Sequence, residues 1–258
     1  MITPRASLLG SQCPVAGAPV TGHAASPYIG DVTIEVDTGA QELRRRLEGE
    51  TFLASVRSAT PAGVRLRTEA ELEASLAHIL RRHEAGQAFH VFAYGSLMWN
   101  PALEHDGEFR ARVHGWHRSF CIRSVIGRGT EETPGLMLGL DRGGSCNGML
   151  LRIPERKVAA ELRLLWLREM PWGSYHARWV TAWAGAVPIR AVTFVVDPRQ
   201  ERYLKALPLQ EAARLINTGR GSLGTTRAYF DATLQKLEEL GVRDRGMERL
   251  HAAVHGSR

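Results

Sequence analysis

Residues 91–101, VFAYGSLMWNP, carry the clearest structural signal in this chain of 258 residues. An apolar run that is typical of a buried strand ends at Gly95 and Ser96. Three large apolar residues follow, and Asn100 and Pro101 end the segment. Glycine and serine allow a tight turn, so that successive backbone N–H groups can converge on one anion. The stretch therefore predicts a strand that opens into a small backbone cup.

Further strands are predicted from runs of apolar and β-branched residues between turn residues. They span 89–94, 111–125, 135–141, 146–153, 178–184 and 189–196. The segment DRGGSCNG, residues 141–148, is predicted to be the turn between two of them. Helices are predicted to begin near Gln41 and to span 155–169, 209–217 and 225–240. Strands in the middle with helices inserted and appended favour an α+β fold over a regular βαβ repeat.

A capping box marks another predicted helix. The sequence TEAE, residues 68–71, places a threonine three positions before a glutamate, which is a helix-start pattern. The apolar residues that follow share one helical face: Leu72, Leu76, Ile79 and Leu80. The segment HEAGQ ends this helix before the strand at 89–94.

Composition is typical of a soluble globular protein, with 44% hydrophobic and 23% charged residues. No segment approaches the ~18–20 apolar residues of a membrane span. Residues 1–36 mix small residues and proline with little periodicity, which predicts a disordered tail and no secretory signal. The cysteines Cys13, Cys121 and Cys146 are too few and too scattered for a disulfide framework or a zinc site. A cytoplasmic location is the resulting expectation.

The net charge of +6 comes mostly from arginines spread along the chain. A basic protein can bind nucleic acid, but it can also bind small anions. Because no dense Lys/Arg block with interleaved aromatic residues is present, the sequence favours a small anionic ligand. A non-enzymatic basic binding module stays open as an alternative.

Three other motifs resemble functional sites, but their sequence context argues against those functions. The segment GRGSLG, residues 219–224, matches a dinucleotide-binding pattern, but it follows a predicted helix instead of a strand, which favours a helix end. His114 and His117 lie three apart on a predicted strand and would face opposite sides, so they could not share a metal. Ser96 lacks the second glycine of the G-x-S-x-G hydrolase motif, which favours a hydrogen-bonding role.

Glu169 is the strongest acid–base candidate. The helix predicted over 155–169 has an apolar stripe of Val158, Leu162, Leu165 and Trp166, and Glu169 falls on the same stripe in the last turn. The arginines of this helix, including Arg168, are predicted on its other sides. Burial and the negative end of the helix dipole both raise a carboxylate pKa. A carboxylate with a raised pKa in a cleft is a general-base candidate, although a structural helix-end glutamate is the competing interpretation.

Six stretches together resemble the ChaC family, whose members are glutathione-specific γ-glutamylcyclotransferases. They are VFAYGSLMWNP, VHGWHRSFCIRS, GLMLGLDRGGSCNGML, LREMPWGSY, VTFVVD and GVRDRGMERL. The resemblance runs from about residue 52 to about residue 250. It implies an α+β fold built on a small mixed β-barrel with flanking helices. The catalytic domain would be a single unit over residues 37–258, and its central part would span residues 89–250.

The resemblance also implies a reaction and a site. Glutathione would be cleaved to 5-oxo-L-proline and L-cysteinylglycine without a metal or an organic cofactor. The loop that holds the γ-glutamyl end would consist of Ala93, Tyr94, Gly95, Ser96, Leu97 and Met98. Glu169 would be the catalytic acid–base. The alanine at 93 departs from the glycine that is frequent in relatives and restricts the backbone there.

Some questions stay open at this level. Tyr175 and Tyr229 could donate hydrogen bonds to the substrate or be ordinary buried aromatics. Arg118 and Arg123 could face the glycine carboxylate of glutathione or pair with surface acids. Other γ-glutamyl amines or amino acids are an alternative substrate class. The oligomeric state is not predicted.

Overall fold

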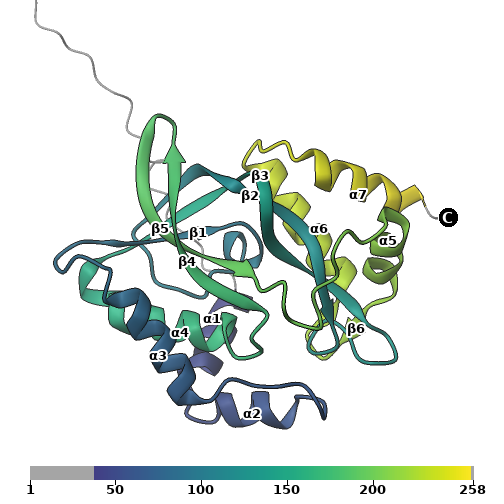
Figure 1. Ribbon diagram of the computed structural model, residues 1–258, viewed down its shortest axis with the longest axis horizontal. Helices are drawn as coiled ribbons and strands as arrows, with labels where there is room; N and C mark the ends of the chain where they lie inside the picture. The colour runs from purple at the N-terminus through teal and green to yellow at the C-terminus, as the bar shows by residue number, and fades with distance from the viewer. Residues whose placement is uncertain (1–37, 257–258) are drawn as a thin grey trace, which may run out of the picture.

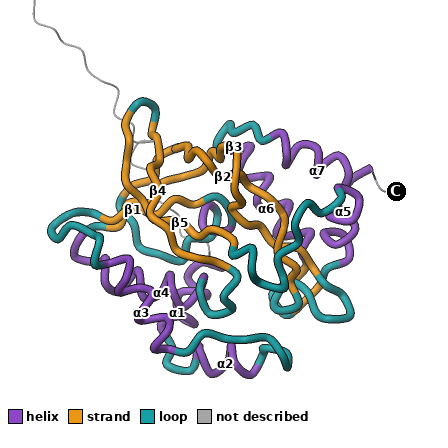
Figure 2. The backbone as a smooth tube through the Cα atoms, viewed as in Figure 1, coloured by secondary structure: helices purple, strands orange, loops and turns teal. Residues whose placement is uncertain are grey.

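The structure is a computed structural model that describes residues 38–256, so the predicted disordered tail, 1–36, lies outside the described residues. A closed barrel of five strands, in the order β1-β3-β2-β4-β5, forms its centre. Helices flank the barrel in two groups (Figures 1 and 2). The predicted α+β class and the small barrel with flanking helices are confirmed.

Four antiparallel pairings and one parallel pairing close the barrel. Its strands are β1 (Phe89–Ala93), β2 (Gly107–Ser124), β3 (Gly135–Ile153), β4 (Tyr175–Ala184) and β5 (Val187–Val196). β3 pairs with both β1 and β2, and β4 pairs with both β2 and β5. Val91 of β1 lies opposite Val192 of β5 in the parallel pair. The barrel is therefore mixed, and its inward residues form the main core.

The β2–β3 hairpin bends where the sequence predicts a turn. Residues 141–148 belong to the continuous strand β3, so the prediction of a turn at DRGGSCNG was wrong. Gly115 of β2 has a φ of 81°, and Gly143 and Gly144 of β3 have φ values of 100° and 68°. These left-handed conformations favour glycine. They fall at one register shift of the ladder and bend both strands there, as bulges do.

The helices form two groups on different sides of the barrel (Figure 1). The first group is α1 (Thr38–Glu48), α2 (Phe52–Ser58), α3 (Glu69–Leu80) and α4 (Val158–Glu169), and the second is α5 (Leu209–Thr218), α6 (Thr226–Glu239) and α7 (Arg245–Gly256). The sequence did not predict α2 or α7. A two-residue hairpin, β6 (Arg220–Gly221) with β7 (Gly224–Thr225), joins α5 to α6. GRGSLG thus follows a helix end, as predicted.

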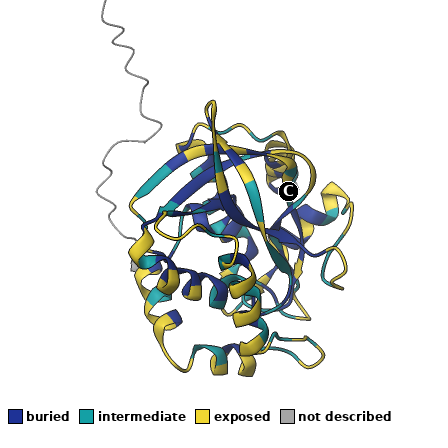
Figure 3. Cartoon of the chain, turned by 60° about the vertical axis from the view of Figure 1, so that its left-hand side comes forward, coloured by how far each residue is buried: buried dark blue, intermediate teal, exposed yellow. Residues whose placement is uncertain are grey.

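Buried residues are concentrated on the strands and on the inward faces of the helices (Figure 3). Trp166 of α4 packs edge-on against Phe194 of β5, with ring centroids 5.5 Å apart. Its indole N–H donates to the hydroxyl of Ser75 on α3 at 2.9 Å. The capping box of α3 forms as predicted, because Thr68 and Glu71 bond to each other's backbone N–H groups. Packing of α4 on the barrel fixes the direction of its last turn.

Within residues 38–256, no helix is both long enough and apolar enough to cross a lipid bilayer.

Candidate active site

The loop after β1 presents unused backbone donors. Residues 96–98 form one short 3₁₀ turn, in which Met98 N–H donates to the Gly95 carbonyl at 2.9 Å. Asn100 N–H donates to the Ser96 carbonyl at 2.7 Å. The N–H groups of Gly95, Ser96 and Leu97 have no acceptor among the described residues. Three consecutive donors are thus available to an anion at the predicted cup.

The loop is held from the barrel side. The Tyr94 hydroxyl donates to the Phe194 carbonyl of β5 at 2.8 Å. Gly148 of β3 allows close approach, because a Cβ there would lie 2.3 Å from the carbonyl oxygen of Ala93. The side chains of the predicted loop residues Ala93, Tyr94, Leu97 and Met98 are buried in the core. Leu97 can therefore reach a ligand through its free backbone N–H group, and Ser96 can reach it through its N–H group and its side chain.

Arg118 fixes the Tyr94 carbonyl. Its side chain is fully buried and donates to the carbonyls of Tyr94 and Asn147, both at 2.7 Å, and to the Asp244 carboxylate at 2.6 Å. This guanidinium therefore has a structural use. Arg123 is exposed. Of the two arginines considered for the glycine carboxylate, one is engaged within the fold and the other faces solvent.

Glu169 ends α4, as predicted from Met170–Pro171. Its side chain is 15% exposed, and Oε1 lies 2.9 Å from Nε of Arg168. Nη2 of Arg168 donates to Ser96 Oγ at 3.1 Å, and Nη1 donates to the carbonyl of Asn100 at 2.5 Å. Arg168 therefore joins the candidate acid to the cup. Arg168 lies off the apolar stripe of α4, so helical periodicity gave no sign of this link.

Burial raises the pKa of Glu169, as expected from its position on the apolar stripe. The charge and the hydrogen bond of Arg168 act in the opposite direction and offset part of this rise. Burial therefore favours the protonated form of Glu169, and Arg168 favours the ionised form. Such an arrangement is typical of a general acid–base.

Three tyrosines lie within electrostatic range of Glu169: Tyr94, Tyr175 and Tyr229. Burial raises the pKa of each phenol, so each stays protonated at neutral pH. Tyr175 donates its O–H to the carbonyl of Leu138 at 2.7 Å. The Tyr229 hydroxyl lies 3.2 Å from the point that a Cβ on Gly95 would occupy, and it has no acceptor among the described residues. Tyr229 thus offers a free donor beside the cup.

The described residues contain no group of three or more His, Cys, Asp or Glu side chains that could hold a metal ion. Cys121 and Cys146 are buried thiols. Burial raises the pKa of Cys121 to about 12, so this thiol is not a ready nucleophile. Glu169 is therefore the acid–base candidate of this region.

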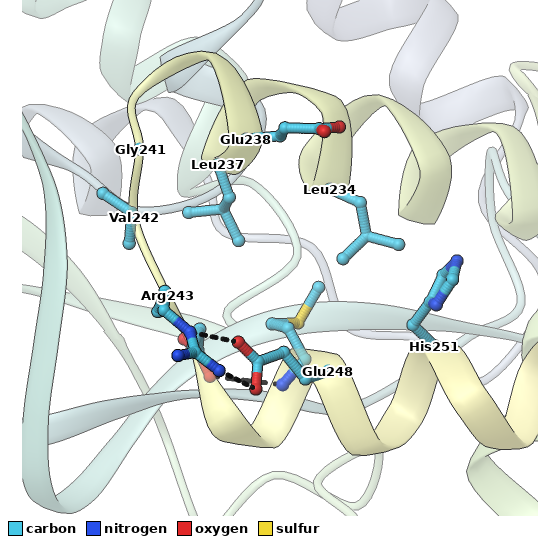
Figure 4. Close-up of a pocket in the computed structure, with 10 residues that line it drawn as sticks. Leu234, Leu237, Glu238, Gly241, Val242, Arg243, Glu248 and His251 are labelled. Carbon is cyan, nitrogen blue, oxygen red and sulfur yellow. Dashed lines mark hydrogen bonds and ion pairs between the residues drawn. The ribbon is translucent and has the colours of Figure 1, made fainter.

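A groove of about 500 Å³ lies elsewhere, between α6 and α7 (Figure 4). Leu234, Leu237 and Val242 give it apolar walls, and the Arg243–Glu248 ion pair lies at its edge. It contains neither Glu169 nor the loop at 94–98. Asp244 lines this groove and pairs with Arg118, which in turn bonds to the Tyr94 carbonyl of the loop. Because it lacks a buried acid opposite free backbone donors, it is not the candidate active site.

Comparison with known proteins assigns the family. A family model described as ChaC-like protein matches residues 89–257. The Escherichia coli (strain K12) protein named glutathione-specific gamma-glutamylcyclotransferase is 41% identical over 165 residues, which cover 64% of this chain and 71% of that protein. The human glutathione-specific gamma-glutamylcyclotransferase 1 is 30% identical over 149 residues, covering 56% and 67% of the two chains.

A solved structure shares the fold. The glutathione-specific γ-glutamyl cyclotransferase from yeast superposes with a TM-score of 0.62 at 18% identity, over 67% of this chain and 98% of the yeast chain. The loop at 94–98 and Glu169 both lie within residues 89–257, the segment that the family model covers. The chain belongs to the ChaC family.

Proposed function

We propose that this protein is a γ-glutamylcyclotransferase that cleaves glutathione to 5-oxo-L-proline and L-cysteinylglycine. The observation that carries the proposal is the link from Glu169 through Arg168 to Ser96, which places one acid beside a cup of free N–H donors. The names of the bacterial and human relatives support the substrate. The reaction needs no added nucleophile, since the substrate supplies its own.

The α-amino group of the γ-glutamyl residue attacks its own γ-carbonyl carbon and closes a five-membered ring. The C–N bond to cysteine then breaks, and cysteinylglycine leaves as an amine after it gains a proton. An intramolecular attack already benefits from proximity. The protein has to remove a proton from the attacking ammonium group, fold the substrate and return a proton to the leaving nitrogen.

Glu169 is the proposed carrier of both protons. An α-amino group titrates near ~8 and an ordinary glutamate near ~4.3, so direct transfer is uphill by roughly 5 kcal/mol. Each unit by which the pKa of the glutamate rises removes about 1.4 kcal/mol of that cost. Burial raises the pKa of Glu169, which narrows the gap. The same carboxyl group can then protonate the leaving amine.

The cup is proposed to hold the α-carboxylate. The free N–H groups of Gly95, Ser96 and Leu97 suit a carboxylate. The Ser96 hydroxyl accepts a hydrogen bond from Arg168, which leaves its own hydrogen available to the substrate. Ala93, Tyr94 and Met98 would contribute by fixing the backbone of the loop.

Tyr229 is the proposed donor to the γ-carbonyl oxygen. Negative charge develops on that oxygen during attack, and a fixed O–H donor stabilises it. The phenol stays protonated because burial raises its pKa, and its hydroxyl has no acceptor within the described part of the chain. Tyr175 has its hydroxyl committed to Leu138 and is a structural neighbour in this proposal.

We place the reaction in one catalytic domain over residues 37–258. Arg44 of α1 supports this extent, because it forms hydrogen bonds of 2.7 and 2.8 Å with the buried carboxylate of Glu161 on α4. We expect the enzyme in the cytoplasm, where glutathione is kept largely reduced.

The test is incubation of the purified protein with reduced glutathione, without added metal, followed by detection of 5-oxoproline. Release of 5-oxoproline with cysteinylglycine in equal amounts supports the proposal. A parallel assay with γ-glutamyl-alanine separates glutathione cleavage from a broader cyclotransferase activity. Binding of labelled nucleic acid without 5-oxoproline formation would instead favour the basic binding module.

A further inference from the structure

Arg128 lies beside the candidate site and forms no ion pair with a carboxylate among the described residues. Arg128 follows β2 and is half-buried. Its only side-chain hydrogen bond among the described residues goes from Nη1 to the Thr225 carbonyl at 3.1 Å. No described carboxylate forms an ion pair with it, and burial lowers its pKa. A partly desolvated guanidinium without a counter-ion is costly, and an anionic ligand would compensate for it.

Arg128 also lies at the Tyr229 ring. Its guanidinium carbon is 5.7 Å from the ring centroid. The hydroxyl of the same tyrosine lies against Gly95, 3.2 Å from the position that a Cβ would occupy there. Tyr229 is therefore a neighbour of both Arg128 and Gly95 of the cup. The two residues beyond the γ-carbonyl of glutathione, cysteine and glycine, span at most about 7 Å. A group that binds the glycine carboxylate therefore has to lie close to the group that binds the γ-carbonyl.

The backbone that carries Arg128 is rigidly mounted. Its carbonyl accepts from the Thr226 hydroxyl at 2.8 Å. Leu223 N–H of the β6–β7 hairpin donates to the Gly127 carbonyl at 2.7 Å. A Cβ on Gly129 would lie 2.1 Å from the Ser124 carbonyl oxygen, so the chain packs here without room for a side chain. A fixed cation can discriminate between ligands better than one on a mobile loop.

The other arginines near the site are less available. Arg118 makes three protein contacts, and Arg168 is bonded to Glu169 and to the loop. Arg67 donates to two main-chain carbonyls, and Arg202 donates to a carbonyl and to a hydroxyl. Arg128 retains the most unused donors beside Tyr229.

We propose that Arg128 binds the glycine carboxylate of glutathione and so determines the preference for the tripeptide over γ-glutamyl compounds that lack this carboxylate. The inference rests on the proposed cyclotransferase activity and adds the residue that selects its substrate. A guanidinium pairs with a carboxylate through two parallel N–H donors, which gives both affinity and orientation.

The test compares glutathione with its glycine monoethyl ester, in which the relevant carboxylate is neutral. We expect the wild-type protein to have a kcat/KM for glutathione at least ~10-fold above that for the ester, the lower end for a charge-assisted hydrogen bond. Arg128→Met should raise the KM for glutathione by at least ~10-fold with little change in kcat. The kcat/KM values of this variant for glutathione and for the ester should be equal. Arg128→Lys should retain part of the preference.

Arg123→Met is the matched control, because this neighbouring arginine is exposed, and it should keep the full preference. Equal kcat/KM values of the wild-type protein for both substrates would overturn the inference, whether or not the Arg128 variants fold. A folded Arg128→Met protein that keeps the preference, or loss of preference in Arg202→Met alone, would also overturn it. A wild-type protein that releases no 5-oxoproline from either substrate would instead contradict the proposed function.

Discussion

Nε of Arg168 lies 2.9 Å from Oε1 of Glu169, its neighbour in the sequence. Adjacent residues on a helix point in different directions, so such a pair is unusual within a regular helix. Here α4 ends at Glu169, and the long arginine side chain reaches around this end to the loop after β1. The acid and the cup are consequently held by one guanidinium, and neither can shift alone without breaking a charged contact.

Arg168→Met should move the acid limb of the pH profile of kcat/KM to higher pH. The positive charge of Arg168 lowers the pKa of Glu169 against the effect of burial, so its removal leaves burial unopposed. A base with a higher pKa stays protonated up to a higher pH, and the protonated form cannot accept the proton of the substrate ammonium group. Activity should therefore be lost at a higher pH than in the wild-type protein. The facing tyrosines, Tyr94, Tyr175 and Tyr229, stay neutral there because burial raises their pKa values.

Arg163→Met is the control for this shift, since Arg163 lies on α4 but is exposed. Its acid limb should coincide with that of the wild-type protein. An unshifted acid limb in a folded Arg168→Met variant would show that the contact does not tune Glu169.

Ser96→Ala should raise the KM for glutathione by about 10-fold, as expected for one lost hydrogen bond to a charged group. The hydroxyl accepts from Arg168 and is the only side-chain hydrogen-bonding group among residues 95–98. Steady-state kinetics measure the effect. A KM that does not change would remove the hydroxyl from substrate binding and leave only backbone donors in the cup.

Tyr229→Phe should lower kcat by about 10²-fold while KM changes little, because a donor to a developing oxyanion acts mainly in the transition state. The ring contacts with Trp99 and Phe120 are retained in the variant, so the fold should persist. Tyr175→Phe gives the comparison, since its hydroxyl is already bonded to Leu138. Equal losses in the two variants would argue against a special role for Tyr229.

Asp244→Ala should lower the free energy of unfolding by about 3 kcal/mol, because it leaves the buried charge of Arg118 unpaired. Urea denaturation measures the loss. Glu248→Ala is the matched control in the same groove, where its pair with Arg243 is exposed, and stability should barely change. If both variants are equally stable, the Arg118–Asp244 pair does not hold the loop region.

The local signals of the sequence predicted the parts of the fold that depend on neighbours in the chain. The capping box at Thr68 and the helix stop at Met170 need only short-range chemistry, and both form. The burial of Glu169 followed from helical periodicity alone. Glu169 could therefore be identified as the candidate acid from the sequence.

Contacts between distant segments could not be predicted in the same way. Glycines at 143 and 144 have the composition of a turn, yet they bend a continuous strand because Gly115 of the paired strand bends at the same level. The guanidinium of Arg168 reaches a loop about seventy residues away, which no periodicity reveals. Its position next to Glu169 was the only local sign of this role.

The central claim is tested most directly by 5-oxoproline release from glutathione by Glu169→Gln, compared with the wild-type protein at equal concentration. Glutamine preserves the shape of the side chain but cannot carry a proton, so the variant should fold normally and lose at least ~10²-fold in kcat. Turnover in the Gln variant close to that of the wild-type protein would contradict the account.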